Sequence, residues 1–170
     1  MVATKKRFLR DLVRGGRAEQ MVADLFTAAD FPSELDKEAR IDWDVKSVYG
    51  QAYFTTEVKY DEYEQRSGNV AIEVFNPRLG KPSGITATKA FFWAHVLADG
   101  VVWVTPVASL KEYLDNHSPG RIIDRGGDNN ATLYLYPSDQ ILVDAFTRVD
   151  NMTVEELQAF VITHLEEIDE

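Results

Sequence analysis

The sequence contains no cysteine among its 170 residues. A chain without thiols cannot form disulfides or thiolate metal sites, so its stability has to come from a packed core. No stretch approaches the roughly 18 to 20 consecutive apolar residues that a membrane-spanning helix requires. The basic N-terminus is not followed by an apolar run and a cleavage site, so no signal peptide is expected. These absences predict a cytoplasmic protein with no membrane partner.

Basic residues are scarce, since 18 Lys and Arg stand against 28 Asp and Glu, a formal net charge of -10 at pH 7. Duplex binding relies on Lys and Arg that neutralise phosphates, so the total argues against a simple nucleic-acid-binding protein. The charge is uneven, because residues 1–18 are net positive whereas residues 150–170 carry no Lys or Arg. A basic surface can therefore exist on this acidic molecule. The alternatives are that the acidity only maintains solubility, or that the chain mimics DNA and inhibits a nucleic-acid enzyme.

Hydrophobic periodicity predicts a single α/β domain over residues 1–170, with one mixed central sheet flanked by helices. A basic N-terminal helix within residues 1–16 is expected to end at Gly15-Gly16, and an acidic helix is expected within residues 150–170. The last helix begins at a capping box, Thr153 to Glu156. The polar, Gly-rich residues 117–130 are expected to form a loop. The predicted helices are residues 4–14, 17–29, 86–94, 110–114 and 153–168, and the predicted strands are residues 40–46, 52–60, 69–75, 100–106 and 132–136.

Two of these strands carry polar side chains suited to chemistry. Residues two apart in a strand point the same way at roughly 6.5 to 7 Å, so Glu57 and Lys59 share a face. If the preceding strand pairs with theirs as a hairpin, Asp42 or Asp44 faces the same pocket. Two carboxylates and the backbone carbonyl of Val58 would make an oxygen-rich site suited to Mg²⁺. The alternative is a surface ion pair of little energetic value.

These residues resemble the motif of the PD-(D/E)xK nucleases, which pair an acidic residue on one strand with E-x-K on the next. The corresponding segments are Ile41-Asp42-Trp43-Asp44 and Glu57-Val58-Lys59, with Glu19 in a preceding helix. Residues 67–73 (SGNVAIE) and 80–85 (GKPSGI) resemble small phage and bacterial endonucleases of the Holliday-junction resolvase type. The resemblance spans about residues 15–105.

The resemblance implies a restriction-endonuclease-like fold and a metal-dependent endonuclease that hydrolyses DNA phosphodiesters, with branched or structured DNA as substrate. It implies Mg²⁺ as cofactor, with Mn²⁺ able to substitute, and a phage or bacterial origin. A homodimer is expected because resolving a symmetric junction requires two active sites. Asp42 is preferred to Asp44, because an apolar residue precedes it and an aromatic one follows. The implied catalytic residues are Asp42, Glu57, Lys59 and Glu19, and the implied metal ligands are Asp42, Glu57, Val58 and Glu19.

A further set of polar side chains lies between residues 66 and 89 and suits phosphate contacts that position a duplex. The alternative for this set is a group of solvated loop charges. Glu73 is expected either to support the site as a second acid or to form an ion pair. A non-catalytic protein of the same fold that binds DNA or protein is the main functional alternative, and a DNA mimic is less favoured because of the basic N-terminus. The expected nucleic-acid-binding residues are Arg66, Asn69, Arg78, Lys81, Ser83 and Lys89.

Overall fold

The computed structural model describes residues 2–36, 38, 42–126 and 130–167, with side chains from Arg14 onward. The predicted start of the first strand at residues 40 and 41 therefore lies outside the described residues, as does the predicted helix end at residue 168. The same holds for the side chains of the basic residues of the N-terminal helix before Arg14.

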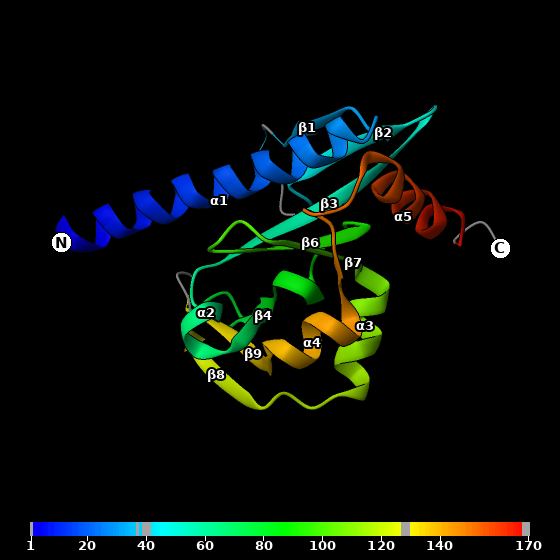
Figure 1. Cartoon of the computed structure of the whole chain (residues 1–170). Coiled ribbons are helices and arrows are strands. Elements are labelled where there is room, and N and C mark those ends of the chain that lie inside the picture. Colours follow the sequence, from blue (N-terminus) through cyan, green and yellow to red (C-terminus); the bar gives the residue numbers. More distant parts are fainter. Residues whose placement is uncertain (1, 37, 39–41, 127–129, 168–170) are drawn as a thin grey trace.

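A six-stranded mixed sheet forms the centre of the molecule (Figure 1). All neighbouring strands pair antiparallel except β3 and β6, which are parallel. The expected hairpin is confirmed, with Val45 opposite Thr56, but its first strand is Val45–Tyr49, so the strand predicted at residues 40–46 is wrong for residues 42–44. The mixed central sheet is confirmed as well. In spatial order the strands are β1 (Ser33–Leu35), β2 (Val45–Tyr49), β3 (Ala52–Asp61), β6 (Phe92–Leu97), β7 (Val102–Pro106) and β10 (Thr147–Arg148).

A second sheet of four antiparallel strands packs below the first, so the expectation of one sheet is wrong. The predicted strand at residues 69–75 exists but belongs to this second sheet. Parallel pairing of β3 with β6 requires a crossover connection, and the chain between them leaves the first sheet through the short helix α2 (Glu64–Ser67) and Gly68, whose φ is 67°. In order the strands are β5 (Lys81–Pro82), β4 (Asn69–Asn76), β9 (Ala131–Pro137) and β8 (Arg121–Gly126).

The two faces of the central sheet bury different cores. Helices α1 (Val2–Ala28) and α5 (Val154–Glu166) cover one face, where the ring centroid of Phe54 lies 5.3 Å from that of Phe26 and 5.6 Å from that of Phe92. The opposite face packs against the second sheet and helices α3 (Val107–Asn116) and α4 (Ser138–Ala145) (Figure 1). The alternation along each strand therefore decides which side chains point between the two sheets.

The predicted helix end at Gly15-Gly16 is wrong, because α1 continues through both glycines. Each glycine costs a helix about 1 kcal/mol relative to alanine. Burial of the apolar side chains of α1, such as Val22 and Phe26, in the core offsets this cost. Despite its length α1 is too polar to cross a membrane, and no other described helix is long and apolar enough to do so.

The predicted helix at residues 86–94 is also wrong. Residues Gly84–Thr86 form a single 3-10 turn, η1, and the following apolar run becomes β6. Every side chain of β6 is buried, because helices cover one face of the central sheet and the second sheet covers the other. A strand that is buried on both faces shows no alternation, so periodicity alone cannot separate it from a helix. Strand β8 lies within the predicted loop at residues 117–130.

The capping box at the start of α5 is confirmed. The Thr153 hydroxyl accepts from the backbone of Glu156 at 3.2 Å, and the Glu156 carboxylate accepts from the backbone of Thr153 at 2.8 Å. We expect Thr153→Ala to lower the free energy of unfolding by about 1 kcal/mol, because one helix donor loses its acceptor. Thr153→Ser keeps the acceptor and serves as the control in urea denaturation. Equal stability of Thr153→Ala and wild type would contradict this role.

Candidate functional site

A row of polar side chains on β3 points toward the second sheet. Glu57, Lys59 and Asp61 alternate along the strand and share this face. On the parallel neighbour β6, Trp93 lies beside Glu57 and His95 lies beside Lys59. The central sheet therefore presents a line of acidic, basic and aromatic groups to the space between the sheets.

Glu57 and Lys59 form an ion pair, with 2.7 Å between the Glu57 Oε1 and the Lys59 Nζ. The Glu57 side chain is 10% exposed and the Lys59 side chain is 35% exposed, so solvent reaches the amine more easily. Burial acts to lower the pKa of Lys59, but the charge and hydrogen bond of Glu57, helped by the nearby carboxylates, raise it above its ordinary value. The amine also lies over the Trp93 ring, 5.8 Å from its centroid. Lys59 is therefore a cation at neutral pH and not a free base.

Asp44 lies beside Glu57. Its Oδ2 accepts a hydrogen bond from the backbone N–H of Val58 at 2.7 Å, which ties the carboxylate to β3. Burial and the charge of Glu57 raise the pKa of Asp44 to about 7, although the Val58 hydrogen bond and Lys59 act to lower it. The charges of Asp44, Glu57 and Lys59 therefore lie close together where β2 begins.

Asp42 occupies a different environment. Its Oδ1 lies 3.6 Å from the Nζ of Lys89, and its side chain is 37% exposed. The Asp42 carbonyl accepts from the backbone N–H of Lys89 and from the Thr88 hydroxyl, both at 3.1 Å. That hydroxyl also lies 3.3 Å from the Glu57 Oε2, so Thr88 links the two segments. Strand β2 begins only at Val45, so the two aspartates do not occupy equivalent positions on a strand.

Glu19 of α1 is half-buried and lies within electrostatic range of the pair. Burial raises the pKa of Glu19, with Lys59 opposing and Glu57 adding to the shift. Within the described ranges, however, no three His, Asp or Glu side chains converge closely enough to hold a metal ion. The geometry therefore provides a carboxylate pair, Asp44 and Glu57, with Glu19 nearby.

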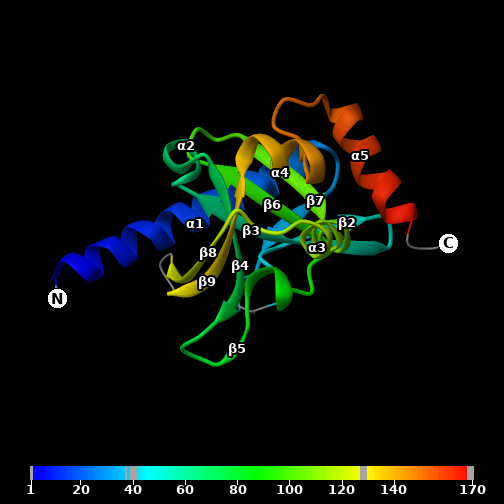
Figure 2. The ribbon, with the colours of Figure 1, turned by 90° about the horizontal axis from the view of Figure 1, so that it is seen from below.

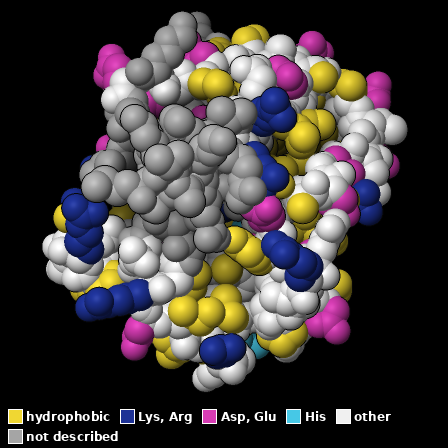
Figure 3. Space-filling model, turned by 90° about the vertical axis from the view of Figure 1, so that its left-hand side faces the viewer, with side chains coloured by type: hydrophobic (Ala, Val, Ile, Leu, Met, Phe, Trp, Pro, Cys, Tyr) yellow, Lys and Arg dark blue, Asp and Glu magenta, His cyan; other side chains and the backbone are white. Residues whose placement is uncertain are grey.

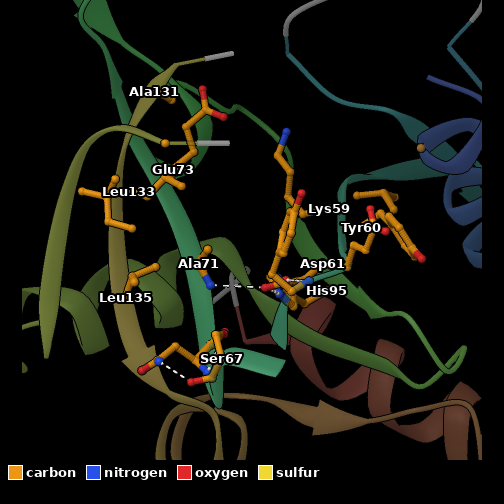
Figure 4. Close-up of a pocket in the computed structure, with 17 residues that line it drawn as sticks. Lys59, Tyr60, Asp61, Ser67, Ala71, Glu73, His95, Ala131, Leu133 and Leu135 are labelled. Carbon is orange, nitrogen blue, oxygen red and sulfur yellow. Dashed lines mark hydrogen bonds and ion pairs between the residues drawn. The ribbon is translucent and has the colours of Figure 1, made fainter. Parts of the chain in front are cut away.

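A cavity of about 480 Å³ adjoins Lys59 and lies between the two sheets (Figure 4). Lys59 borders it from the central sheet and Glu73 borders it from β4, so the structure brings Glu73 to the site. Leu133 and Leu135 of β9 line the opposite wall. The charged row on β3 therefore opens onto a hollow that is lined partly by aliphatic side chains.

Asp61 and His95 form a buried pair at this cavity. The His95 Nε2 lies 3.1 Å from the Asp61 Oδ2, and Asp61 also accepts the backbone N–H groups of Tyr63, Glu64 and Ala71. Burial acts to raise the pKa of Asp61, but the hydrogen bond and charge of His95 and these N–H groups lower it below its ordinary value. The predicted strand ends at residue 60, whereas β3 continues to Asp61, a residue that the sequence did not single out. Extending the alternation of Glu57 and Lys59 by two residues would have found it.

The expected nucleic-acid-binding residues lie in separate groups. Arg66, which lies over the Tyr63 ring at 5.2 Å, is in α2 and Asn69 begins β4, whereas Arg78 and Lys81 are beyond the end of β4. Seven residue steps of an extended strand separate these groups by roughly 23 Å, and Figure 2 shows α2 and β5 far apart. The last two members, Ser83 and Lys89, flank η1.

Basic side chains are nevertheless present on one face of this acidic chain (Figure 3). The N-terminal half of α1 extends away from the rest of the molecule (Figures 1 and 2), and Gly15 of α1 lines the cavity. On the face in Figure 3, Lys and Arg side chains lie around an area of exposed apolar side chains, interspersed with Asp and Glu. An acidic chain thus presents basic groups on this face.

A scan against protein-family models finds no match, and no curated protein matches the chain in sequence. Among solved structures, a bacterial homing endonuclease, I-Ssp6803I, is similar with a TM-score of 0.52 at 11% identity, over 93% of this chain and 95% of that chain. The Holliday junction resolvase Hjc of Archaeoglobus fulgidus matches 71% of this chain and 84% of that chain at 13% identity, with a TM-score of 0.39. The likeness to the homing endonuclease covers nearly all of both chains, and it shows that this mixed α/β domain shares the fold of that protein.

Proposed function

We propose that this chain is a metal-dependent endonuclease that hydrolyses DNA phosphodiesters, with branched or structured DNA as its substrate. One observation carries the proposal: Asp44, Glu57 and the cationic Lys59 meet beside an open cavity. Their order along the chain, an acid before E-x-K, is that of the PD-(D/E)xK motif. The fold shared with the homing endonuclease supports the same conclusion.

The carboxylate pair suits a divalent cation. Two carboxylates that lie close together bind a cation favourably, because the cation removes the repulsion between their charges. The pKa of Asp44, raised to about 7 by burial and by Glu57, is a sign of that unrelieved repulsion. Mg²⁺ retains several waters and needs few protein ligands, so Asp44, Glu57 and the Val58 carbonyl would hold it, with Glu19 close by. Mn²⁺ prefers the same oxygen ligands.

The chain's own groups have separate roles in this reaction. The metal, when bound, supplies a more acidic water and stabilises charge on the phosphate. The Lys59 ammonium binds a phosphate oxygen and stabilises the negative charge that develops there. Since Lys59 is already held as a cation by Glu57, its role is electrostatic and it does not accept the proton of the attacking water.

The basic residues of α1 are proposed to contact the DNA backbone. Residues 1–18 are net positive, and α1 extends from the body next to the cavity. Phosphate contacts by Lys and Arg position a nucleic acid without reading its sequence. A homodimer would supply the two sites that symmetric cleavage of a junction requires.

The test is cleavage of labelled four-way junction, duplex and single-stranded DNA in the presence of Mg²⁺ or Mn²⁺. We expect wild type to cut the junction, and Glu57→Gln and Lys59→Ala each to lower the rate by about 10²- to 10³-fold, as loss of a charge-stabilising group does. Glu155→Gln and Lys111→Ala, at exposed helix positions, are the matched controls and should retain the full rate.

Two results would overturn the proposal. A folded wild type that binds the junction but cuts none of the substrates with either metal would be a non-catalytic binding protein of this fold. A protein that neither cuts nor binds DNA at low salt would favour the alternative that the chain is a DNA mimic.

A further inference from the structure

We propose that the cavity between the two sheets is a pocket for one nucleotide displaced from the DNA stack. This inference rests on the proposed nuclease function and names the part of the substrate next to the cleaved phosphate. The cavity volume of about 480 Å³ lies within the roughly 300–1,000 Å³ that is typical of sites for small molecules. A single nucleotide belongs to that size class, whereas a base pair in a continuous duplex cannot enter a space between two packed sheets.

The position of the cavity connects it to the reaction. Lys59 lies on its border, and Figure 4 shows the Lys59 amine and the Glu73 carboxylate near the same end of the space. A phosphate bound by Lys59 would place its attached nucleoside within reach of the interior. A base could enter from that end while its phosphate stays at the charged rim.

One wall of the cavity suits the flat face of a base. Ile123, Leu133 and Leu135 of the second sheet line it with aliphatic groups, together with the small side chains of Ala71 and Ala131. Apolar side chains commonly pack on both faces of a base that has left the stack. The two alanines leave the width that a planar ring requires.

The polar groups of the cavity suit the edge of a base. His95 lines the cavity and is 1% exposed, and its Nδ1 has no hydrogen-bond partner among the described residues. With the Nε2–H donated to Asp61, Nδ1 accepts a hydrogen bond when the imidazole is neutral and donates one when it is protonated. Buried polar atoms are rarely left unpaired, and the amino or imino group of a base is a suitable donor. Asn69, whose Nδ2 donates to the Ser67 carbonyl at 2.8 Å, adds an amide oxygen at the other end.

The pocket would also explain the preference for branched DNA that we propose above. Moving a base out of a duplex costs a few kcal/mol, and the cost is lowest where the base is already unpaired or mismatched. A pocket next to Lys59 would therefore favour cleavage beside an unpaired nucleotide, such as those at a junction or bulge.

The experiment measures nucleotide binding without metal and without cleavage. ¹⁵N-labelled wild type is titrated with each deoxynucleoside monophosphate and, separately, with inorganic phosphate. We expect the nucleotides to shift the amide signals of Ala71, Ala131 and Leu133, and inorganic phosphate to leave those signals in place. Leu135→Trp fills the cavity and should weaken nucleotide binding at least tenfold, as should the smaller change Leu133→Phe. Thr132→Val, on the same strand but outside the lining, should bind like wild type.

A second measurement uses 2-aminopurine, whose fluorescence rises when the base leaves the stack. Junction DNA carrying this base beside the branch should brighten several-fold on binding wild type, and not on binding Leu135→Trp. Nucleotide shifts confined to α1, or an unchanged cleavage rate in both cavity-filled variants, would overturn the pocket and leave the nuclease in place. Nucleotide binding by a wild type that cuts no DNA would instead overturn the proposed function and leave a nucleotide pocket.

Discussion

Asp44→Asn is expected to lower the rate of metal-dependent cleavage by about 10²- to 10³-fold, whereas Asp42→Asn should lower it no more than about threefold. Asp44 shares its environment with Glu57, whose charge adds to burial in raising the pKa of Asp44. Asp42 instead contacts the exposed Lys89 at 3.6 Å. The two substitutions are chemically identical and two residues apart, so each is the control for the other. The measurement is single-turnover cleavage of junction DNA at saturating Mg²⁺.

The same substitution should stabilise the metal-free protein. The pKa of Asp44 rises on folding from 3.8 to about 7 because of burial and Glu57, so ionised Asp44 opposes folding. This penalty is absent below about pH 4, grows as the pH rises toward 7, and is complete above 7. Asp44→Asn keeps an acceptor for the Val58 N–H and removes the charge, so its free energy of unfolding at pH 8 should exceed that of wild type by about 1–3 kcal/mol.

Urea denaturation at pH 4 and pH 8, with EDTA present, measures this difference. An Asp44→Asn variant that is no more stable than wild type at pH 8 would contradict the electrostatic account. Loss of cleavage in Asp42→Asn with a normal rate in Asp44→Asn would assign the acidic role to Asp42, as the motif resemblance implied.

Asp61→Ala is expected to lower the free energy of unfolding by about 3–5 kcal/mol. The Asp61 carboxylate accepts from three backbone N–H groups and contacts His95, so its removal leaves several buried donors without an acceptor. These bonds connect β3 to α2, β4 and β6. Asp115→Ala, at an exposed helix position, should change the stability by less than about 0.5 kcal/mol.

The contribution of Asp61 should depend on pH with the opposite sign to that of Asp44. Its folded pKa lies below 3.8 because its hydrogen bonds outweigh burial, so its stabilising effect is present above pH 4 and is lost as the pH falls through the folded pKa. The difference between Asp61→Ala and wild type should therefore shrink in acid. A difference that is constant from pH 2 to pH 7 would show that the carboxylate charge is not responsible.

The local pattern was sufficient where polar and apolar side chains alternate or a capping motif is present. The alternation around Glu57 predicted β3 and its hairpin with β2, and the capping box at Thr153 predicted the start of α5. It failed for β6, since a strand buried on both faces has no alternation to detect. It also failed at Gly15-Gly16, where packing of the rest of α1 outweighs the local cost of two glycines.

The sequence by itself determined that Glu57 and Lys59 share one face of a strand, because side chains two residues apart in a strand point the same way. Only the tertiary structure decided which aspartate joins them, because that depends on where β2 begins and on the hydrogen bond from Val58 to Asp44. The sequence likewise did not predict the cavity. It exists because β4 and β5 of the crossover between β3 and β6 join β8 and β9, from later in the chain, in a second sheet that faces Lys59. Residues more than 60 positions away, such as Leu133, therefore complete its wall.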